Sequence, residues 1–393
     1  GIGAVNNGMI VGHGELRKMA MADPNAEYPT AEELEKMKEI LRENLRQGGF
    51  GMSLGLEYVP GAFAHEGELI ELAKVAKEFD VPVPVHMRSE GPHVFEALDE
   101  MARVARGSGA HVHISHWKIG NFPGNVERMM QVADRYLKEG LNMSFDQYPY
   151  TASSTGLSYV TPKEFRGKPK AEMLRILQDD AEFEELKKGI AVEMSRRRPE
   201  TVFICYTHGA APECDGKNLL EIGELWGTDV YETIRRILIK TGTVCQVAFH
   251  SMIKEECAII AKRMDVCVIS DSSAFDFISR EVPGVPHPRN FGTFTHFLRW
   301  AREDHLMPLE KAIYKMTALP AATFQIKDRG QLKEGFFADV TVFDPETVTD
   351  HGDYQHPAEL STGVKAVFVN GTLAFYEGRP TGSRTGVGLL RER

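Results

Sequence analysis

Three side chains with metal-site chemistry stand at the ends of strand-like runs in this chain. His86 and His116 each close an apolar run, and each is followed two positions later by a basic residue. Asp271 closes a third run in the same way. Neutral imidazoles and a carboxylate are preferred ligands of catalytic zinc, and the carboxylate can also act as a base toward activated water. Together the three predict a metal-dependent hydrolase.

Composition allows a large enzyme and argues against several other classes. The 393 residues are 42% hydrophobic and carry a net charge of −10, with no basic stripe beyond Arg196–Arg198. We expect that run to cap or follow a helix, so nucleic-acid binding is disfavoured. The five cysteines are odd in number and lack CxxC spacing, which favours a reducing cytoplasm. No run approaches the roughly 20 apolar residues of a membrane span, and no signal segment is evident.

The pattern along the chain is that of strands alternating with helices around a parallel sheet. Six barrel strands are predicted, near residues 8–12, 50–56, 82–88, 111–118, 142–148 and 266–271. Residues 153–215 depart from the alternation. They read as a charged, helix-prone insertion, which is either a lid over the barrel mouth or a solvated structural excursion.

The tail changes character after about residue 325. Two β segments follow, and the second contains Asn370-Gly371, a hairpin turn signal. We therefore expect a barrel over residues 1–325 and a small β domain over residues 326–393.

Eight short motifs in order along nearly the whole chain carry a family resemblance. They are VGHGELR at 11–17, GMSLGLEYVPG at 51–61, HMRSEG at 86–91, ISHWK at 114–118, DQYPYTASS at 146–154, SD at 270–271, HPRNFGTF at 287–294 and GFFAD at 335–339. With these motifs the chain resembles the N-acyl-D-amino-acid deacylases (D-aminoacylases) of the amidohydrolase superfamily. The resemblance implies an α/β fold, a (β/α)8 TIM-type barrel with metal ligands at the carboxyl ends of its strands and a small β domain.

The same resemblance assigns roles to residues of this sequence. It makes His86 and His116 zinc ligands, with one or two ions in the intact family, and Asp271 the catalytic acid and base. Lys118 lies on the same side of its strand as His116 and could bind a substrate carboxylate, or be a surface lysine. Other positions expected near the substrate, each with packing, turn formation or a structural salt bridge as its alternative, are Tyr58, Tyr150, Ser154, Arg88 and Arg289.

The sequence departs from the family pattern at its beginning. The family places a His-x-His pair on the first strand and, in many members, a bridging cysteine on the second, and neither motif stands before Met9. His111-Val-His113 has the spacing but falls inside a later strand. Six strands are also fewer than the eight that close such a barrel. We expect the first strands to be missing here, supplied by a longer chain or a second polypeptide, or lost in a degenerate relative.

The sequence thus predicts zinc-dependent hydrolysis of N-acyl-D-amino acids, giving a carboxylate and a free D-amino acid. Two alternatives stay open. One is a cyclic-amide hydrolase of the dihydroorotase or hydantoinase kind, which shares the chemistry. The other is a catalytically silent relative or fragment, suggested by the absent ligands. The expected partner is a small-molecule substrate, without nucleic acid or membrane, and an oligomer is possible.

Overall fold

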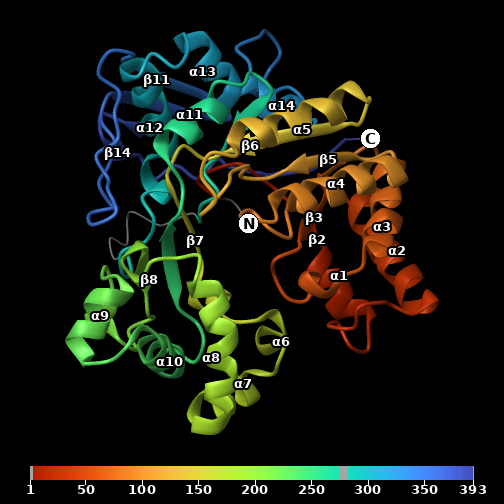
Figure 1. Ribbon diagram of the computed structural model, residues 1–393. Helices are drawn as coiled ribbons and strands as arrows, with labels where there is room; N and C mark the ends of the chain where they lie inside the picture. The colour runs from red at the N-terminus through yellow and green to blue at the C-terminus, as the bar shows by residue number, and fades with distance from the viewer. Residues whose placement is uncertain (1–2, 274–281, 393) are drawn as a thin grey trace.

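A six-stranded parallel sheet forms the centre of the larger unit (Figure 1). The computed structural model describes residues 3–273 and 282–392. The sheet order is β10-β6-β5-β4-β3-β2, and every neighbouring pair is parallel. The strands are β2 (Val11–Gly12), β3 (Met52–Gly55), β4 (Pro82–His86), β5 (His111–Ile114), β6 (Met143–Gln147) and β10 (Val266–Val268). All six predicted strands are therefore confirmed, and they form an arc of a (β/α)8 barrel.

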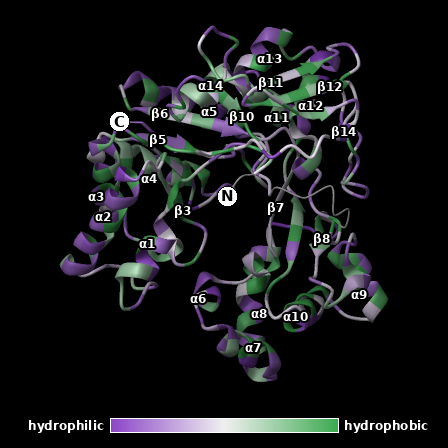
Figure 2. Cartoon of the chain, turned by 180° about the vertical axis from the view of Figure 1, so that it is seen from behind, coloured by the Kyte–Doolittle hydropathy of each residue, from purple (hydrophilic) through white to green (hydrophobic). Residues whose placement is uncertain are grey.

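Amphipathic helices cover the outer face of this sheet. They are α1 (His13–Ala20), α2 (Ala31–Arg46), α3 (Glu66–Glu78), α4 (Val94–Ser108), α5 (Val126–Lys138) and α11 (Lys254–Ala261). Their inner faces join the strand side chains in one apolar core, which includes Leu72 and Val85. Hydrophobic and hydrophilic segments alternate along these helices (Figure 2). The capping box of Thr30 and Glu33 opens α2 as predicted.

An insertion between β6 and β10 folds around a core of its own. Its antiparallel sheet has the order β7-β9-β8, formed by β7 (Ala152–Gly156), β8 (Val202–Tyr206) and β9 (Gln246–His250). Helices α6 (Lys163–Arg166), α7 (Lys170–Gln178), α8 (Asp180–Met194), α9 (Leu219–Trp226) and α10 (Val230–Lys240) pack with it. The excursion expected over residues 153–215 is the first part of this longer unit, because β7 and β8 both pair with β9.

The last third of the chain returns to the barrel and then builds the small β domain. After β10 come α12 (Arg289–Glu303), α13 (Leu309–Met316) and α14 (Ala318–Thr323). The antiparallel sheet follows with the order β11-β12-β13-β14, from β11 (Val340–Phe343), β12 (Val364–Val369), β13 (Thr372–Tyr376) and β14 (Arg379–Pro380). Asn370 and Gly371 both have positive φ between β12 and β13, which confirms the predicted hairpin turn.

The two ends of the described chain are joined by a short parallel pair. Strand β1 (Asn7–Gly8) pairs with β15 (Gly388–Leu389). Asn6 adds to this junction, because its side chain accepts the N–H of Val387 and donates to Asp339. The small β domain is thereby tied to the start of the barrel. No helix among the residues that the structure describes is long and apolar enough to cross a membrane.

Burial in the barrel core predicts that two leucines contribute very differently to the free energy of unfolding. Leu72 on α3 is 0% exposed, whereas Leu332 is 85% exposed. Leu72→Ala removes buried methyl groups and leaves a cavity, so we expect a loss of about 2–5 kcal/mol in unfolding free energy. Leu332→Ala, the matched control, should change it by less than about 0.5 kcal/mol. Thermal and urea unfolding check this, and equal losses in both variants would contradict the assigned core.

Candidate active site

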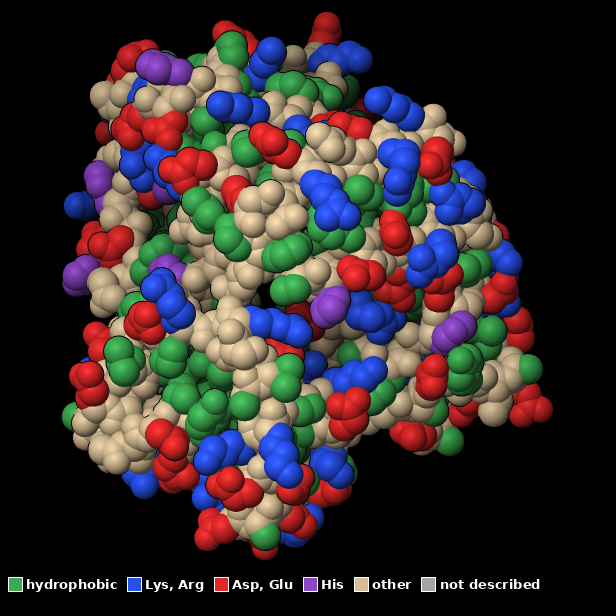
Figure 3. All heavy atoms as spheres, viewed as in Figure 1, with side chains coloured by type: hydrophobic (Ala, Val, Ile, Leu, Met, Phe, Trp, Pro, Cys, Tyr) green, Lys and Arg blue, Asp and Glu red, His purple; other side chains and the backbone are tan. Residues whose placement is uncertain are grey.

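A cavity of about 450 Å³ opens at the carboxyl ends of the barrel strands, between the barrel and the insertion. Basic side chains gather around this hollow (Figure 3). Its lining brings together eight of the nine residues predicted from the sequence, namely Tyr58, His86, Arg88, His116, Lys118, Ser154, Asp271 and Arg289. These residues come from six different segments of the chain. The segments after β3, β4, β5 and β10 converge because parallel strands end at one edge of the sheet, whereas β7 and α12 supply Ser154 and Arg289.

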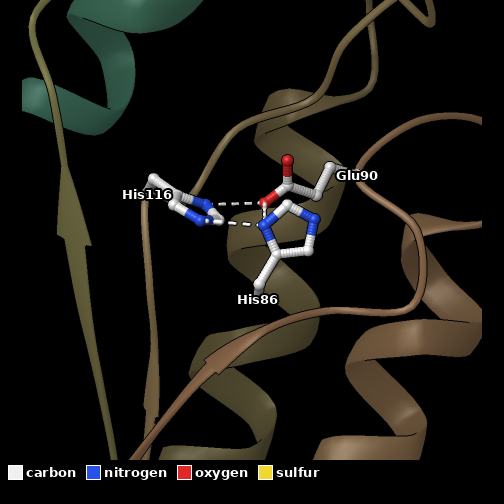
Figure 4. A group of neighbouring side chains, drawn as sticks. All are labelled: His86, Glu90 and His116. Carbon is white, nitrogen blue, oxygen red and sulfur yellow. Dashed lines mark hydrogen bonds and ion pairs between the residues drawn. The ribbon is translucent and has the colours of Figure 1, made fainter. Parts of the chain in front are cut away.

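His86 and His116 face each other through ring nitrogens. His86 is the last residue of β4, and His116 stands two positions past β5 with a positive φ of 39°. The distance from His86 Nδ1 to His116 Nε2 is 3.0 Å (Figure 4). Two imidazole nitrogens directed at one point are what a shared metal ion requires. The predicted convergence of the two histidines is therefore present in the structure.

Each imidazole has a carboxylate at its other nitrogen. Glu57 Oε2 lies 2.9 Å from His86 Nε2, and Glu90 Oε1 lies 2.7 Å from His116 Nδ1. Such carboxylates fix the tautomer and the orientation of a ligand histidine and increase its basicity. Burial acts to lower the pKa of His86, but the charge of Glu90 and the hydrogen bond to Glu57 raise it above its ordinary value.

Glu90 also belongs to the group that could hold an ion. The ligand atoms of His86, Glu90 and His116 all lie within 4.8 Å of one another. Burial acts to raise the pKa of Glu90, but His116 and Lys118 hold it well below its usual range, so the carboxylate is ionised. In the observed arrangement Glu90 lies at the outer nitrogen of His116, so His86 Nδ1 and His116 Nε2 are the donors that face each other.

Lys118 lies at the same end of the cavity. Its Nζ is 2.5 Å from Glu90 Oε2 and 3.1 Å from the carbonyl oxygen of His116, which accepts from it. The side chain is buried yet lines the cavity, on the same side as His116, although both residues lie past the end of β5.

A buried network under the site supports the backbone of His116. Asp146 accepts the N–H of His116 with one carboxylate oxygen, and its other oxygen lies 2.7 Å from His113 Nε2. Ser144 Oγ lies 2.6 Å from His113 Nδ1 and 2.7 Å from His111 Nε2. The pair with His-x-His spacing thus contacts β6, and Asp146 links His113 to the turn at His116. The pair does not line the cavity.

Asp271 and Arg289 occupy the β10 side of the cavity as an ion pair. Asp271 Oδ2 lies 2.7 Å from Arg289 Nη1, and Asp271 adopts a positive φ of 47° three residues beyond β10. Arg289, the first residue of α12, is buried, and its guanidinium lies over the ring of Tyr148 at 5.0 Å. The pair places a buried cation against the carboxylate that sequence analysis predicts to transfer protons.

One predicted residue, Tyr150, lies outside the cavity, and another, Arg88, forms the structural salt bridge that was its alternative. Tyr150 does not line the cavity, since its ring stacks on His296 with centroids 4.6 Å apart. The strand ends at Gln147, so alternation no longer fixes the next side chains, and Tyr148 faces the cavity instead. Arg88 reaches the cavity wall, but its guanidinium binds Glu100 at 2.9 Å and the carbonyl oxygens of two residues, Ala62 and Ala64.

The remaining predicted contacts lie where expected. The Tyr58 ring lies 4.5 Å from that of His86, and burial raises the pKa of its phenol, which keeps the hydroxyl protonated. Ser154 is in the middle of β7 and lines the cavity. Sequence analysis did not identify four further lining residues from the insertion, which are Tyr159, Glu193, Arg196 and Arg197. The arginine run does follow a helix, as predicted, since α8 ends at Met194.

Comparison with known proteins identifies the relatives of this chain. Residues 270–375 match the model of an amidohydrolase family, Amidohydro_3. N-acyl-D-glutamate deacylase of Alcaligenes xylosoxydans xylosoxydans is 34% identical over 381 residues, which are 96% of this chain and 68% of that protein. D-aminoacylase of the same organism is 32% identical over 392 residues, 99% of this chain and 71% of that protein.

Solved structures similar to this chain include deacylases of the same kind as these relatives. One is N-acyl-D-glutamate deacylase from Bordetella bronchiseptica, complexed with zinc and a phosphonate mimic of the tetrahedral intermediate. It matches with a TM-score of 0.81 and 33% sequence identity, and the match covers 99% of this chain and 72% of that one. A D-aminoacylase described with a binuclear metal centre and one-metal activation matches with a TM-score of 0.78 and 29% identity over 99% and 72%. A D-hydantoinase at 13% identity and a TM-score of 0.53, over 99% and 74%, shows a shared fold alone.

The chain therefore belongs to the N-acyl-D-amino-acid deacylase (D-aminoacylase) family of the amidohydrolases.

The support under His116 predicts an effect on metal affinity. Asp146→Asn keeps the shape of the side chain but removes the charge that accepts the His116 N–H and pairs with His113. We expect zinc affinity to fall by about 10- to 100-fold, as when a partner of a ligand is lost. Chelator competition measures this. The control is Asp134→Asn, which breaks an ion pair with Arg263 outside the cavity, and an equal loss there would contradict the assignment.

Proposed function

We propose that this protein hydrolyses the amide bond of N-acyl-D-amino acids, with zinc held by His86 and His116. One observation carries the proposal: two carboxylate-backed imidazoles meet in a cavity that also contains Asp271, in a chain 34% identical to an N-acyl-D-glutamate deacylase. The reaction consumes one water and yields a carboxylate and a free D-amino acid. Zinc in such a site supplies Lewis acidity toward a carbonyl oxygen and activates water at neutral pH.

The histidines contribute geometry. Because Glu57 and Glu90 occupy the outer nitrogens, His86 Nδ1 and His116 Nε2 are the atoms directed at the ion. One ion is enough for this arrangement, and the one-metal activation described for D-aminoacylase supports a single zinc.

Asp271 moves the proton. Its carboxylate accepts a proton from the attacking water and later gives it to the leaving nitrogen, so that the amine departs neutral. Arg289, 2.7 Å away, keeps the carboxylate aimed into the cavity. General acid and base catalysis of this kind contributes about 10²- to 10⁴-fold.

Substrate positioning falls to the groups around the ion. Lys118 carries its ammonium beside His116 and would bind the α-carboxylate, since a cation there offers a charge-assisted hydrogen bond. The Tyr58 hydroxyl and the Ser154 hydroxyl would donate to the acyl or carboxylate oxygens. Arg88 is left out of this set, because its guanidinium is held by Glu100 and by the carbonyl oxygens of Ala62 and Ala64. Lys118 is also paired, with Glu90, but its ammonium lies directly beside His116.

The hydantoinase alternative has weaker support. That likeness rests on 13% identity and concerns the fold alone, whereas the deacylases match at about twice that identity or more. The other alternative, a catalytically silent relative, is tested by the experiment on stereochemistry and metal dependence at the end of this subsection.

We further propose that the protein works in a reducing compartment such as the cytoplasm. All five cysteines are free and buried. Burial raises the pKa of Cys267 to about 11, so this thiol stays protonated and is a poor nucleophile.

The proposal predicts selective loss of turnover in one variant. Asp271→Asn should lower kcat by at least about 10²-fold on N-acetyl-D-amino acids while leaving zinc content unchanged, because the carboxylate is assigned to proton transfer. Asp353→Asn, a control on an exposed side chain outside the cavity, should keep wild-type kcat. Retained turnover in Asp271→Asn would remove the assigned role.

Stereochemistry and metal dependence test the activity itself. The zinc-loaded protein should hydrolyse N-acetyl-D-amino acids and leave the L-isomers intact. Treatment with a chelator should abolish turnover, and added zinc should restore it. If the loaded protein hydrolyses neither isomer, the silent alternative is correct.

A further inference from the structure

Nearly every charged side chain around the cavity already has an opposite partner. Lys118 pairs with Glu90 at 2.5 Å, and Arg289 pairs with Asp271 at 2.7 Å. The other lining arginines are also neutralised: Arg88 by Glu100 at 2.9 Å and Arg197 by Glu193 at 2.8 Å. These pairs leave little free positive charge for a second anion.

Arg196 is the exception. Its side chain lines the cavity, and it has no ion pair or hydrogen bond with any residue of ranges 3–273 and 282–392. The residue is exposed, so its guanidinium can turn toward a ligand. A planar guanidinium binds a carboxylate through two parallel hydrogen bonds, which makes it a specific receptor for that group.

The insertion holds Arg196 in place through its neighbours. Helix α8 ends at Met194, whose side chain belongs to the core of the insertion. Arg197 donates to the carboxylate and to the carbonyl oxygen of Glu193, and its guanidinium lies over the ring of Phe249 at 5.2 Å. Met194, two positions before Arg196, and Arg197, directly after it, are thus both anchored, so the short backbone segment between them stays at the cavity wall.

The place of Arg196 separates it from the reacting atoms. Lys118 is two residues from His116 on the barrel, whereas Arg196 belongs to the insertion (Figure 1). An N-acyl-D-amino acid whose amide lies at His86 and His116 presents its α-carboxylate to Lys118. Arg196, on the insertion, is then placed to meet the substrate side chain, which extends away from the amide.

We propose that Arg196 binds the side-chain carboxylate of the substrate and makes this protein selective for acidic N-acyl-D-amino acids. The inference rests on the proposed deacylase function and specifies its substrate class. Arg196 is a specificity residue in this account and takes no part in proton transfer.

The test compares two substrates of nearly the same shape and different charge. N-acetyl-D-glutamate and N-acetyl-D-glutamine differ only in the side-chain carboxylate and amide. The zinc-loaded full chain should prefer the glutamate by about tenfold in kcat/KM, which corresponds to about 1.4 kcal/mol. Arg196→Gln should reduce kcat/KM on the glutamate by about tenfold and change it little on the glutamine.

Arg198→Gln is the matched control. Arg198 belongs to the same run, lies near Glu200 at 3.5 Å and does not line the cavity, so its loss should leave the preference intact. Wild-type preference for the glutamine, or equal losses in both variants, would overturn the proposal. So would a carboxylate effect confined to the acyl group, measured with N-succinyl- and N-acetyl-D-alanine.

Equilibrium binding separates this proposal from the deacylase function. If the wild-type chain hydrolyses no N-acyl-D-amino acid, the proposed function fails, and binding of the same two ligands to the zinc-loaded protein still tests Arg196. Tighter binding of the glutamate that disappears in Arg196→Gln would support the role of Arg196. Equal affinities for the two ligands in the wild-type chain would overturn it.

Discussion

The contact of His86 Nδ1 with His116 Nε2 is the interaction on which the rest of this structure depends. Two imidazole nitrogens 3.0 Å apart need partners that hold both rings, and Glu57 and Glu90 supply them. The ionised Glu90 in turn needs a counter-charge in a buried place, which Lys118 provides. Each group of the site therefore depends on the next.

The barrel makes this arrangement possible because parallel strands end at one edge of the sheet. Five neighbouring strands place their carboxyl ends around the cavity, and the insertion closes its other side. The turn at His116 is held from below by Asp146 and His113, which are nearly inaccessible to solvent. The two proposed ligand histidines lie at the strand ends of a rigid sheet, and the proposed specificity residue lies on a separate unit. This division would let the ligand geometry stay constant while the substrate pocket varies.

Much of this could be predicted from the sequence, and the reasons for the rest are physical. Period-two alternation holds up to the strand end, and it predicts the position of His86, the last residue of β4. His116 lies two positions past β5, so its motif and not the alternation identified it. Alternation also stops at the end of β6, so Tyr150 was assigned to the cavity in place of Tyr148. Glu57 lies past the end of its strand, and no spacing rule connects it to His86. Arg196 reaches the site only through the packing of the insertion, a long-range contact that local patterns do not encode.

Anomalous diffraction at the zinc edge, on crystals grown with zinc, tests the central claim most directly. The account predicts one strong peak between the two rings, at about 2.0–2.1 Å from His86 Nδ1 and from His116 Nε2. A map without a peak at that place, or with zinc bound only elsewhere on the protein, would contradict it.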